Sequence, residues 1–118
     1  MRFMFAIQHD ESVLDALPEG ELQKLIDSAL DYTEALRKSG HYIASDALQP
    51  VRTARTVRVR GSHVSTTDGP FAETKEQLGG FFLIEAKDMD EACEIASRFP
   101  PARVGTIEVR PVKELFHS

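Results

Sequence analysis

The chain has 118 residues, which is enough for one compact domain and too few for two independently folding units. Apolar residues make up 42% and charged residues 28% of the sequence, so the composition is that of an ordinary globular protein and not of a disordered one. A formal net charge of -5 argues against attraction to nucleic-acid phosphates, and the single cysteine, Cys93, excludes an internal disulfide and a cysteine-based zinc site.

The chain carries no requirement for an oxidising compartment, and its first apolar run, residues 3–7, is too short for a signal-peptide core or a membrane span. Nucleotide-loop, dinucleotide-binding, zincin and α/β-hydrolase motifs are all absent from the sequence. We therefore expect a cytoplasmic protein with no metal, no cofactor, no membrane contact and no direct contact with nucleic acid.

Two strands and a helix are predicted in the first part of the chain. Residues 3–7 are a continuous apolar run of strand formers, which suits a strand buried on both faces. A helix is predicted from Pro18, because apolar residues then recur at spacings of three, four and seven, and Gly40 ends it. A second strand is predicted from Tyr42 to about Ala47.

A hairpin is predicted next, inserted near residues 54–68. Val57 and Val59 alternate with Arg58 and Arg60, so this stretch is expected to be half exposed, and a turn follows at once. The single domain, residues 1–118, is thus expected to consist of two similar halves with a hairpin between them.

The second half repeats the order of the first. Residues 79–86 predict another strand buried on both faces, and a helix follows whose start is an Asp-type capping box of Asp88 and Glu91. Two prolines end this helix before a last strand at residues 105–112. Its predicted apolar face consists of Ala92, Cys93, Ala96 and Phe99, which places Cys93 in the core.

This order predicts an α+β fold, namely a ferredoxin-like antiparallel sheet with two helices on one face. Two helices cover only one face, yet Phe3 and Phe5 point to one side of the first strand while Met4 and Ala6 point to the other. The uncovered face must be buried against something, and we predict a homodimer in which two sheets face one another.

The most unusual stretch is the loop that follows the hairpin. Asp68 is a candidate acceptor or base, Lys75 a candidate contact for an anion, and Phe71 a candidate wall residue of a pocket. The alternative is a plain turn, with Asp68 as a cap, Phe71 as an apolar plug and the charges in solvent.

The string DGPFAETKEQLGGFFLIEA at residues 68–86, together with GTIEVRPV at residues 105–112, resembles the DGPF-type branch of the YCII-related family. The resemblance covers roughly residues 40–113. It implies a dimeric α+β barrel and a cleft that holds a His and Asp pair, with no settled substrate. Asp68 matches the motif directly, whereas residues 18–39, where the family histidine is expected, contain no histidine.

The resemblance also implies an alternative class of function. Members of the DGPF branch are often encoded beside extracytoplasmic-function sigma factors, so the chain could be a regulatory module that contacts a sigma factor. The acidic net charge of -5 suits contact with a protein partner better than contact with DNA.

Two further residues are candidates by position. His9 ends the first strand, where a histidine can act as a general base near neutral pH; the alternative is an exposed histidine without a role. Asp46 is expected to share a strand face with Tyr42. If that face looks into the dimer, Asp46 is a buried carboxylate and a candidate ligand contact.

Four arginines lie within nine residues, and guanidinium groups grip carboxylates and phosphates, which makes Arg58 a candidate ligand contact. The alternative is that these charges protect a strand edge from pairing.

The leading hypothesis is a homodimer that binds a small polar molecule in a cleft or barrel, with Asp68 and His9 in acid/base chemistry. A purely structural assembly module, with a filled barrel, is a third interpretation.

Overall fold

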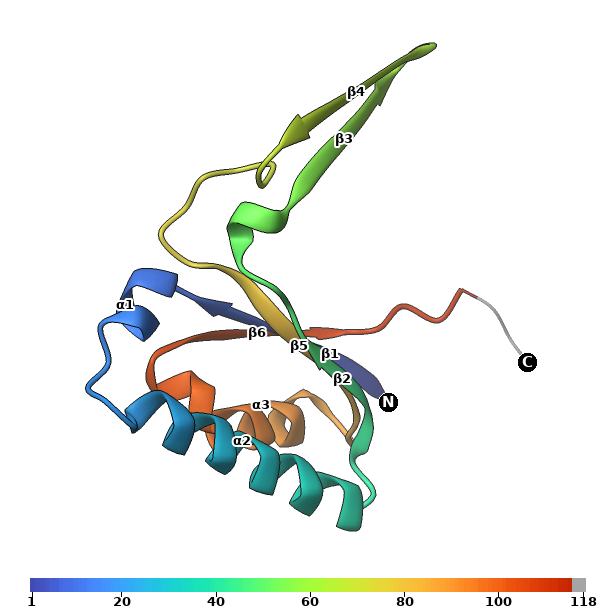
Figure 1. Ribbon diagram of the computed structural model, residues 1–118. Helices are drawn as coiled ribbons and strands as arrows, with labels where there is room; N and C mark the ends of the chain where they lie inside the picture. Colours follow the sequence, from blue (N-terminus) through green and yellow to red (C-terminus); the bar gives the residue numbers. More distant parts are fainter. Residues whose placement is uncertain (116–118) are drawn as a thin grey trace.

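A four-stranded sheet and two long helices form the body of the protein in the computed structural model, which describes residues 1–115. A separate two-stranded sheet projects from the body (Figure 1). The strands are β1 (Arg2–His9), β2 (Tyr42–Ala47), β3 (Arg55–Arg60), β4 (His63–Asp68), β5 (Gln77–Glu85) and β6 (Gly105–Pro111). The helices are α1 (Glu11–Asp15), α2 (Glu21–Lys38) and α3 (Met89–Ser97), with 3-10 turns at Val51–Thr53 and Pro100–Arg103.

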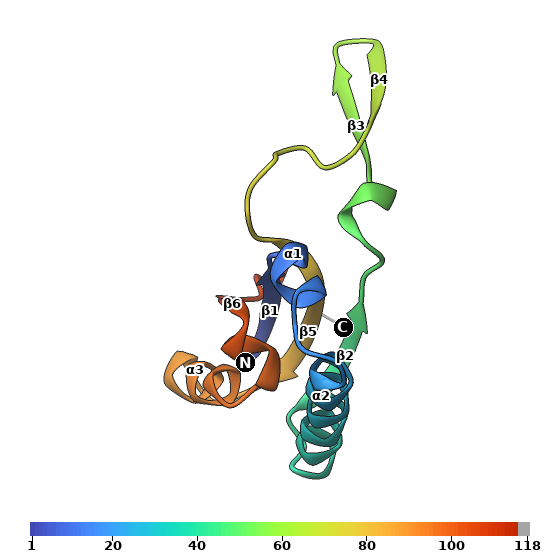
Figure 2. The same ribbon diagram turned by 60° about the vertical axis from the view of Figure 1, so that its left-hand side comes forward.

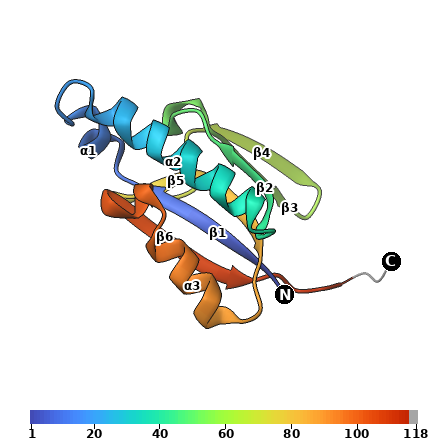
Figure 3. The same cartoon turned by 90° about the horizontal axis from the view of Figure 1, so that it is seen from below.

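The four-stranded sheet has the order β2-β5-β1-β6, and every neighbouring pair is antiparallel. Helices α2 and α3 lie side by side on one face of this sheet (Figure 3). This arrangement confirms the predicted ferredoxin-like α+β fold. The second face carries no helix from the described part of the chain, and we call it the open face. No helix within residues 1–115 combines the length and the apolar character that a membrane crossing requires.

The core lies between the sheet and the helices. Phe3, Phe5 and Ile84 are fully buried there, because strand alternation sends every second side chain of β1 and β5 toward the helices. The other set of side chains lies on the open face, as predicted. Its central members are Met4 and Ala6 of β1 and Phe81 and Leu83 of β5.

The start of α3 is fixed by the predicted capping box. The Asp88 carboxylate accepts a hydrogen bond from the Glu91 amide at 2.9 Å, and the Glu91 side chain accepts one from the Lys87 amide at 2.9 Å. Cys93, however, is exposed, so its predicted place in the core is wrong. The buried side chains are Ala92, Ile95 and Ala96, and a residue one position after Ala92 is turned by about 100° from them.

A β-bulge overturns the prediction that Tyr42 and Asp46 share a face. The register of β2 against β5 shifts between Tyr42 and Ala44, so the alternation is broken there. Tyr42 pairs with Ile84 on the helix side, whereas Asp46 pairs with Phe81 on the open face. Asp46 is exposed, and its carboxylate is not buried in the chain.

Strands β3 and β4 form the predicted hairpin, residues 55–68, which we call the arm. Within residues 1–115 its two strands pair only with each other, and the arm stands on the side of the sheet opposite to α2 and α3 (Figures 1 and 2). Its turn uses Gly61, whose φ of +61° favours glycine. The arm therefore extends away from the body on the side of the open face.

Gly105 marks a close approach of β6 to β1. A Cβ atom added at this position would lie 2.2 Å from the backbone oxygen of Gln8, which cannot move without disturbing the sheet. We expect Gly105→Ala to lower the free energy of unfolding by about 1–3 kcal/mol, as overpacking does. Urea denaturation followed by circular dichroism measures this change. Gly61→Asn is the control and should be nearly neutral, because asparagine tolerates a positive φ; equal effects of the two substitutions would contradict the prediction.

Candidate functional site

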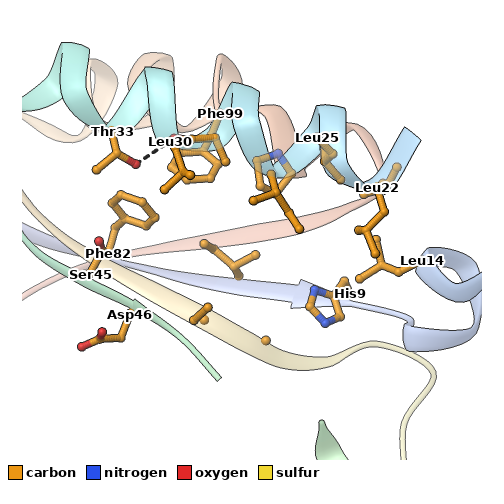
Figure 4. Close-up of a pocket in the computed structure, with 18 of the residues that line it drawn as sticks. His9, Leu14, Leu22, Leu25, Leu30, Thr33, Ser45, Asp46, Phe82 and Phe99 are labelled. Atoms are coloured by element: carbon orange, nitrogen blue, oxygen red, sulfur yellow. Dashed lines mark hydrogen bonds between the residues drawn. The ribbon is translucent and has the colours of Figure 1, made fainter. Parts of the chain in front are cut away.

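The main cavity is a groove of about 410 Å³ between α2 and the helix side of the sheet (Figure 4). Its walls are mostly apolar. Leu22, Ile26 and Leu30 line it from α2, although all three are among the exposed large apolar residues of the chain. They occupy one stripe of the helix at four-residue spacing, so α2 turns an apolar edge toward an open space instead of toward the core.

His9 lies at one end of this groove, near Leu14 and Leu22 (Figure 4). It is the last residue of β1, and alternation from Phe5 through Ile7 directs its side chain to the helix side of the sheet. The imidazole lies over Gly79: a Cβ atom there would be 2.0 Å from the Cε1 atom of His9. Only glycine at position 79 therefore leaves room for the ring in this place.

The short helix α1 closes the groove at the His9 end with Leu14. Its N-cap is Asp10, whose carboxylate accepts hydrogen bonds from the Ser12 hydroxyl at 2.6 Å and the Ser12 amide at 2.9 Å. These bonds lower the pKa of Asp10, the hydroxyl bond most. Because the pKa is depressed, the cap is present at neutral pH and is lost only as the pH falls through that lowered value.

Polar groups gather at the other end of the groove. The hydroxyls of Tyr42 and Ser45 are 2.9 Å apart, and the guanidinium of Arg37 lies 4.3 Å from the centre of the Tyr42 ring. Arg37 also approaches Glu34 at 3.8 Å on the helix surface. The hydroxyl of Thr33 is bonded to the backbone of its own helix. The groove thus has apolar walls, an imidazole at one end and a cation at the other.

The structure does not bring the predicted catalytic pair together. Asp68 ends β4 at the base of the arm, where its carboxylate is 88% exposed and pairs with Arg55 at 3.2 Å. His9 lies in the groove on the helix side of the sheet. Asp68 makes neither the predicted contact with a histidine nor a backbone cap among the described residues, since its partner there is Arg55.

The predicted ligand contacts are also dispersed. Phe71 is 80% exposed, so it is not an apolar plug in this chain. Arg58 lies on the arm. Asp46 borders the groove, but its carboxylate points away from α2 (Figure 4). Lys75 lines a second and smaller cavity of about 310 Å³, together with Asp10, on the other side of α1.

This second cavity joins the loop at residues 69–76 to the start of α1. Glu11 anchors it by accepting a hydrogen bond from the Val51 amide at 2.9 Å, and the charge of Lys75 contributes to the lowered pKa of Asp10. Within residues 1–115, no three histidine, cysteine, aspartate or glutamate side chains lie close enough together to hold a metal ion.

Comparison with known proteins places this chain in a family. The model of the YCII-related domain matches residues 1–116. The chain belongs to the YCII-related family. An uncharacterised protein of Rhizobium meliloti (strain 1021) is 33% identical over 114 residues, which are 95% of this chain and 92% of that protein.

One solved structure is similar across nearly the whole chain. It is 5-chloro-2-hydroxyhydroquinone dehydrochlorinase from Burkholderia phenoliruptrix AC1100, in complex with 2,5-dihydroxybenzoquinone. The match covers 96% of this chain and 94% of that one, with 21% sequence identity and a TM-score of 0.48.

Two parts of the groove escaped the sequence analysis. Leu14 belongs to a five-residue helix that no periodicity could indicate. The sequence does indicate a special role for Gly79, because adjacent glycines within a strand often mark a place where another group approaches the backbone closely. That signal does not say which group approaches, and here it is the imidazole of His9.

Proposed function

We propose that the groove between α2 and the sheet binds a small organic molecule with a mainly apolar body, and that His9 exchanges a proton with it. The observation that carries this proposal is the position of an imidazole at one end of an apolar groove. An imidazole has one ring nitrogen that can accept a proton and one that can donate a proton. A ligand that displaces water from between apolar walls strengthens the polar contacts made beside it.

The size and the lining of the groove support a particular class of ligand. Its volume of about 410 Å³ falls within the range of small-molecule sites. Leucine and isoleucine side chains favour an aromatic or branched aliphatic body over the polar molecule expected from the loop of Asp68. Arg37 at the far end favours an anionic group there, since guanidinium groups bind carboxylates well. The proposed ligand class is therefore a small aromatic or branched aliphatic acid.

Nuclear magnetic resonance of the isotope-labelled protein tests the site. Aromatic carboxylic acids are titrated in parallel with the matching neutral amides. We expect the acids to change the chemical shifts of His9, Leu22 and Ile26 and to leave those of Val59 on the arm unchanged. Shifts confined to the arm or to the open face, or no binding by any acid, would count against it.

We also propose that the protein is a homodimer with the open faces of two sheets in contact. The centre of that face is apolar, and its margins carry Asp46, Glu108 and Arg110, as at protein interfaces with an apolar centre and a charged rim. The chain exposes 8530 Å², about 2100 Å² more than a folded monomer of 13.2 kDa is expected to expose. A standard interface buries about 800 Å² per partner, so one interface accounts for about two-fifths of this excess. Light scattering at micromolar concentration tests the dimer, and a monomer would refute it.

A further inference from the structure

We propose that the arm of each chain closes over a second copy that sits on the open face, so that the dimer is held by mutually exchanged arms. This inference rests on the dimer proposed above and adds a separate contact to it. The site in the groove lies on the helix side of the sheet and takes no part in this contact.

The arm and the open face lie on the same side of the molecule. Helices α2 and α3 lie on one side of the sheet and the arm on the other, in both Figure 1 and Figure 2. A second sheet laid on the open face must therefore lie beside the arm. The arm also makes the chain extended: the radius of gyration is 16.3 Å, against about 13.5 Å expected for a compact chain of this length.

The arm has one apolar face that no other segment of residues 1–115 covers in a single copy. Val57, Val59 and Val64 are 60%, 57% and 61% exposed, and Val59 and Val64 are directly opposed across the two strands. Alternation puts Val57 on the same face. An isolated two-stranded hairpin is at best marginally stable in water, and an apolar face that packs against another surface supplies the missing stability.

Charge identifies the occupant as a second copy of this chain. The arm carries Arg55, Arg58 and Arg60 against one carboxylate, that of Asp68, so it is basic, whereas the whole chain has a net charge of -5. The rest of the molecule is correspondingly acidic, and the margins of its open face carry two exposed carboxylates, Asp46 and Glu108, beside one cation, Arg110. A basic arm is thus complementary to the body of an identical chain. Nucleic acid is disfavoured, because the arm has no phenylalanine, tyrosine or tryptophan on which bases could stack.

The arm can be altered without touching the core, which makes the proposal testable. Val59→Thr with Val64→Thr removes the apolar contact and keeps β-branched residues in both strands. We expect the dissociation constant of the dimer, measured by analytical ultracentrifugation, to rise at least 100-fold. The matched control is Val13→Thr, the same change at an exposed valine of α1 on the body, and it should leave the constant unchanged.

A charge-reversal experiment identifies the partner surface. Arg58→Glu with Arg60→Glu makes the arm acidic, and Asp46→Arg with Glu108→Arg makes the rim of the open face basic. We expect each double variant alone to dimerise at least 10-fold more weakly than the wild type, and an equimolar mixture of the two to recover part of the affinity. No recovery in the mixture would overturn the assigned pairing of arm and rim.

Deletion of the arm separates this inference from the dimer itself. Ala54 and Gly69 are joined by a backbone hydrogen bond of 2.8 Å, so residues 55–68 can be replaced by an Asn-Gly turn. If the wild-type protein is a monomer, both the dimer and the exchange of arms are overturned. If the wild type is a dimer and the deletion leaves its affinity unchanged, only the exchange of arms is overturned. A dimer that weakens at least 100-fold, with an unchanged circular dichroism spectrum of the body, supports it.

Discussion

Replacing Phe5 with alanine is expected to lower the free energy of unfolding by about 3–5 kcal/mol, the usual cost of truncating a buried phenylalanine. Phe5 is 0% exposed and lies on β1, where it is paired with Phe82 of β5 and Val109 of β6. Its ring therefore lies in the hydrophobic core between the sheet and the helices. The loss arises from the apolar surface returned to water and from the cavity that rigid neighbours leave unfilled.

Urea denaturation monitored by circular dichroism measures the effect. The matched control is Phe71→Ala, which removes the same side chain from a position that is 80% exposed and should change stability by less than about 0.5 kcal/mol. Phe5→Leu leaves a smaller cavity and provides a measurable variant if the alanine variant does not fold. Similar losses for Phe5→Ala and Phe71→Ala would mean that the arrangement of the core is wrong.

On the proton-exchange role proposed for His9, His9→Gln is expected to reduce turnover of a groove ligand by about 100-fold or more, the usual contribution of a general acid or base. Glutamine keeps a polar side chain of similar length but cannot exchange a proton near neutral pH. His63→Gln, at an exposed position on the arm, is the matched control and should retain the rate.

Gly79→Ala tests the position of His9 without changing His9. The added methyl group would lie 2.0 Å from Cε1 of the imidazole, so the ring must leave its place. We expect the rate to fall nearly as far as in His9→Gln and the imidazole signals in nuclear magnetic resonance to move. Gly80→Ala is the control, because its methyl group would meet the Asp46 carbonyl at 3.0 Å and not the imidazole. Unchanged imidazole signals in Gly79→Ala would show that the glycine does not position the ring.

The regular elements of this fold could be predicted from the sequence because each is encoded locally. Each predicted element depends on residues that are close together in the sequence. Examples are the apolar runs around Phe5 and Phe82 and the capping box at Asp88. Their order then restricts the topology to a few arrangements. Local patterns also explain the error at Cys93, because a small apolar residue beside a helix stripe looks the same whether it points in or out.

The candidate site could be predicted only in part, because its residues meet through tertiary structure. His9 was identified from its place at a strand end, and the structure puts it in the groove. Its expected partner, Asp68, lies at the base of the arm and away from the groove. No local sequence pattern encodes the direction of the arm. The bulge near Tyr42 is equally hidden, since one extra residue reverses the face of every later side chain in β2 while composition stays the same.

The arm interrupts the connection between two strands that are direct neighbours. The backbone amide of Leu48 donates to the carbonyl of Gly79 at 2.9 Å, so the chain leaves the sheet and returns to it at one point. Because the entropy cost of closing a loop rises by only about 0.6 kcal/mol per doubling of length, the sheet tolerates an insertion of almost any size here. The arm can thus diverge between related chains while the groove stays constant, which would let each chain select its own copies from a mixture of relatives with the same fold.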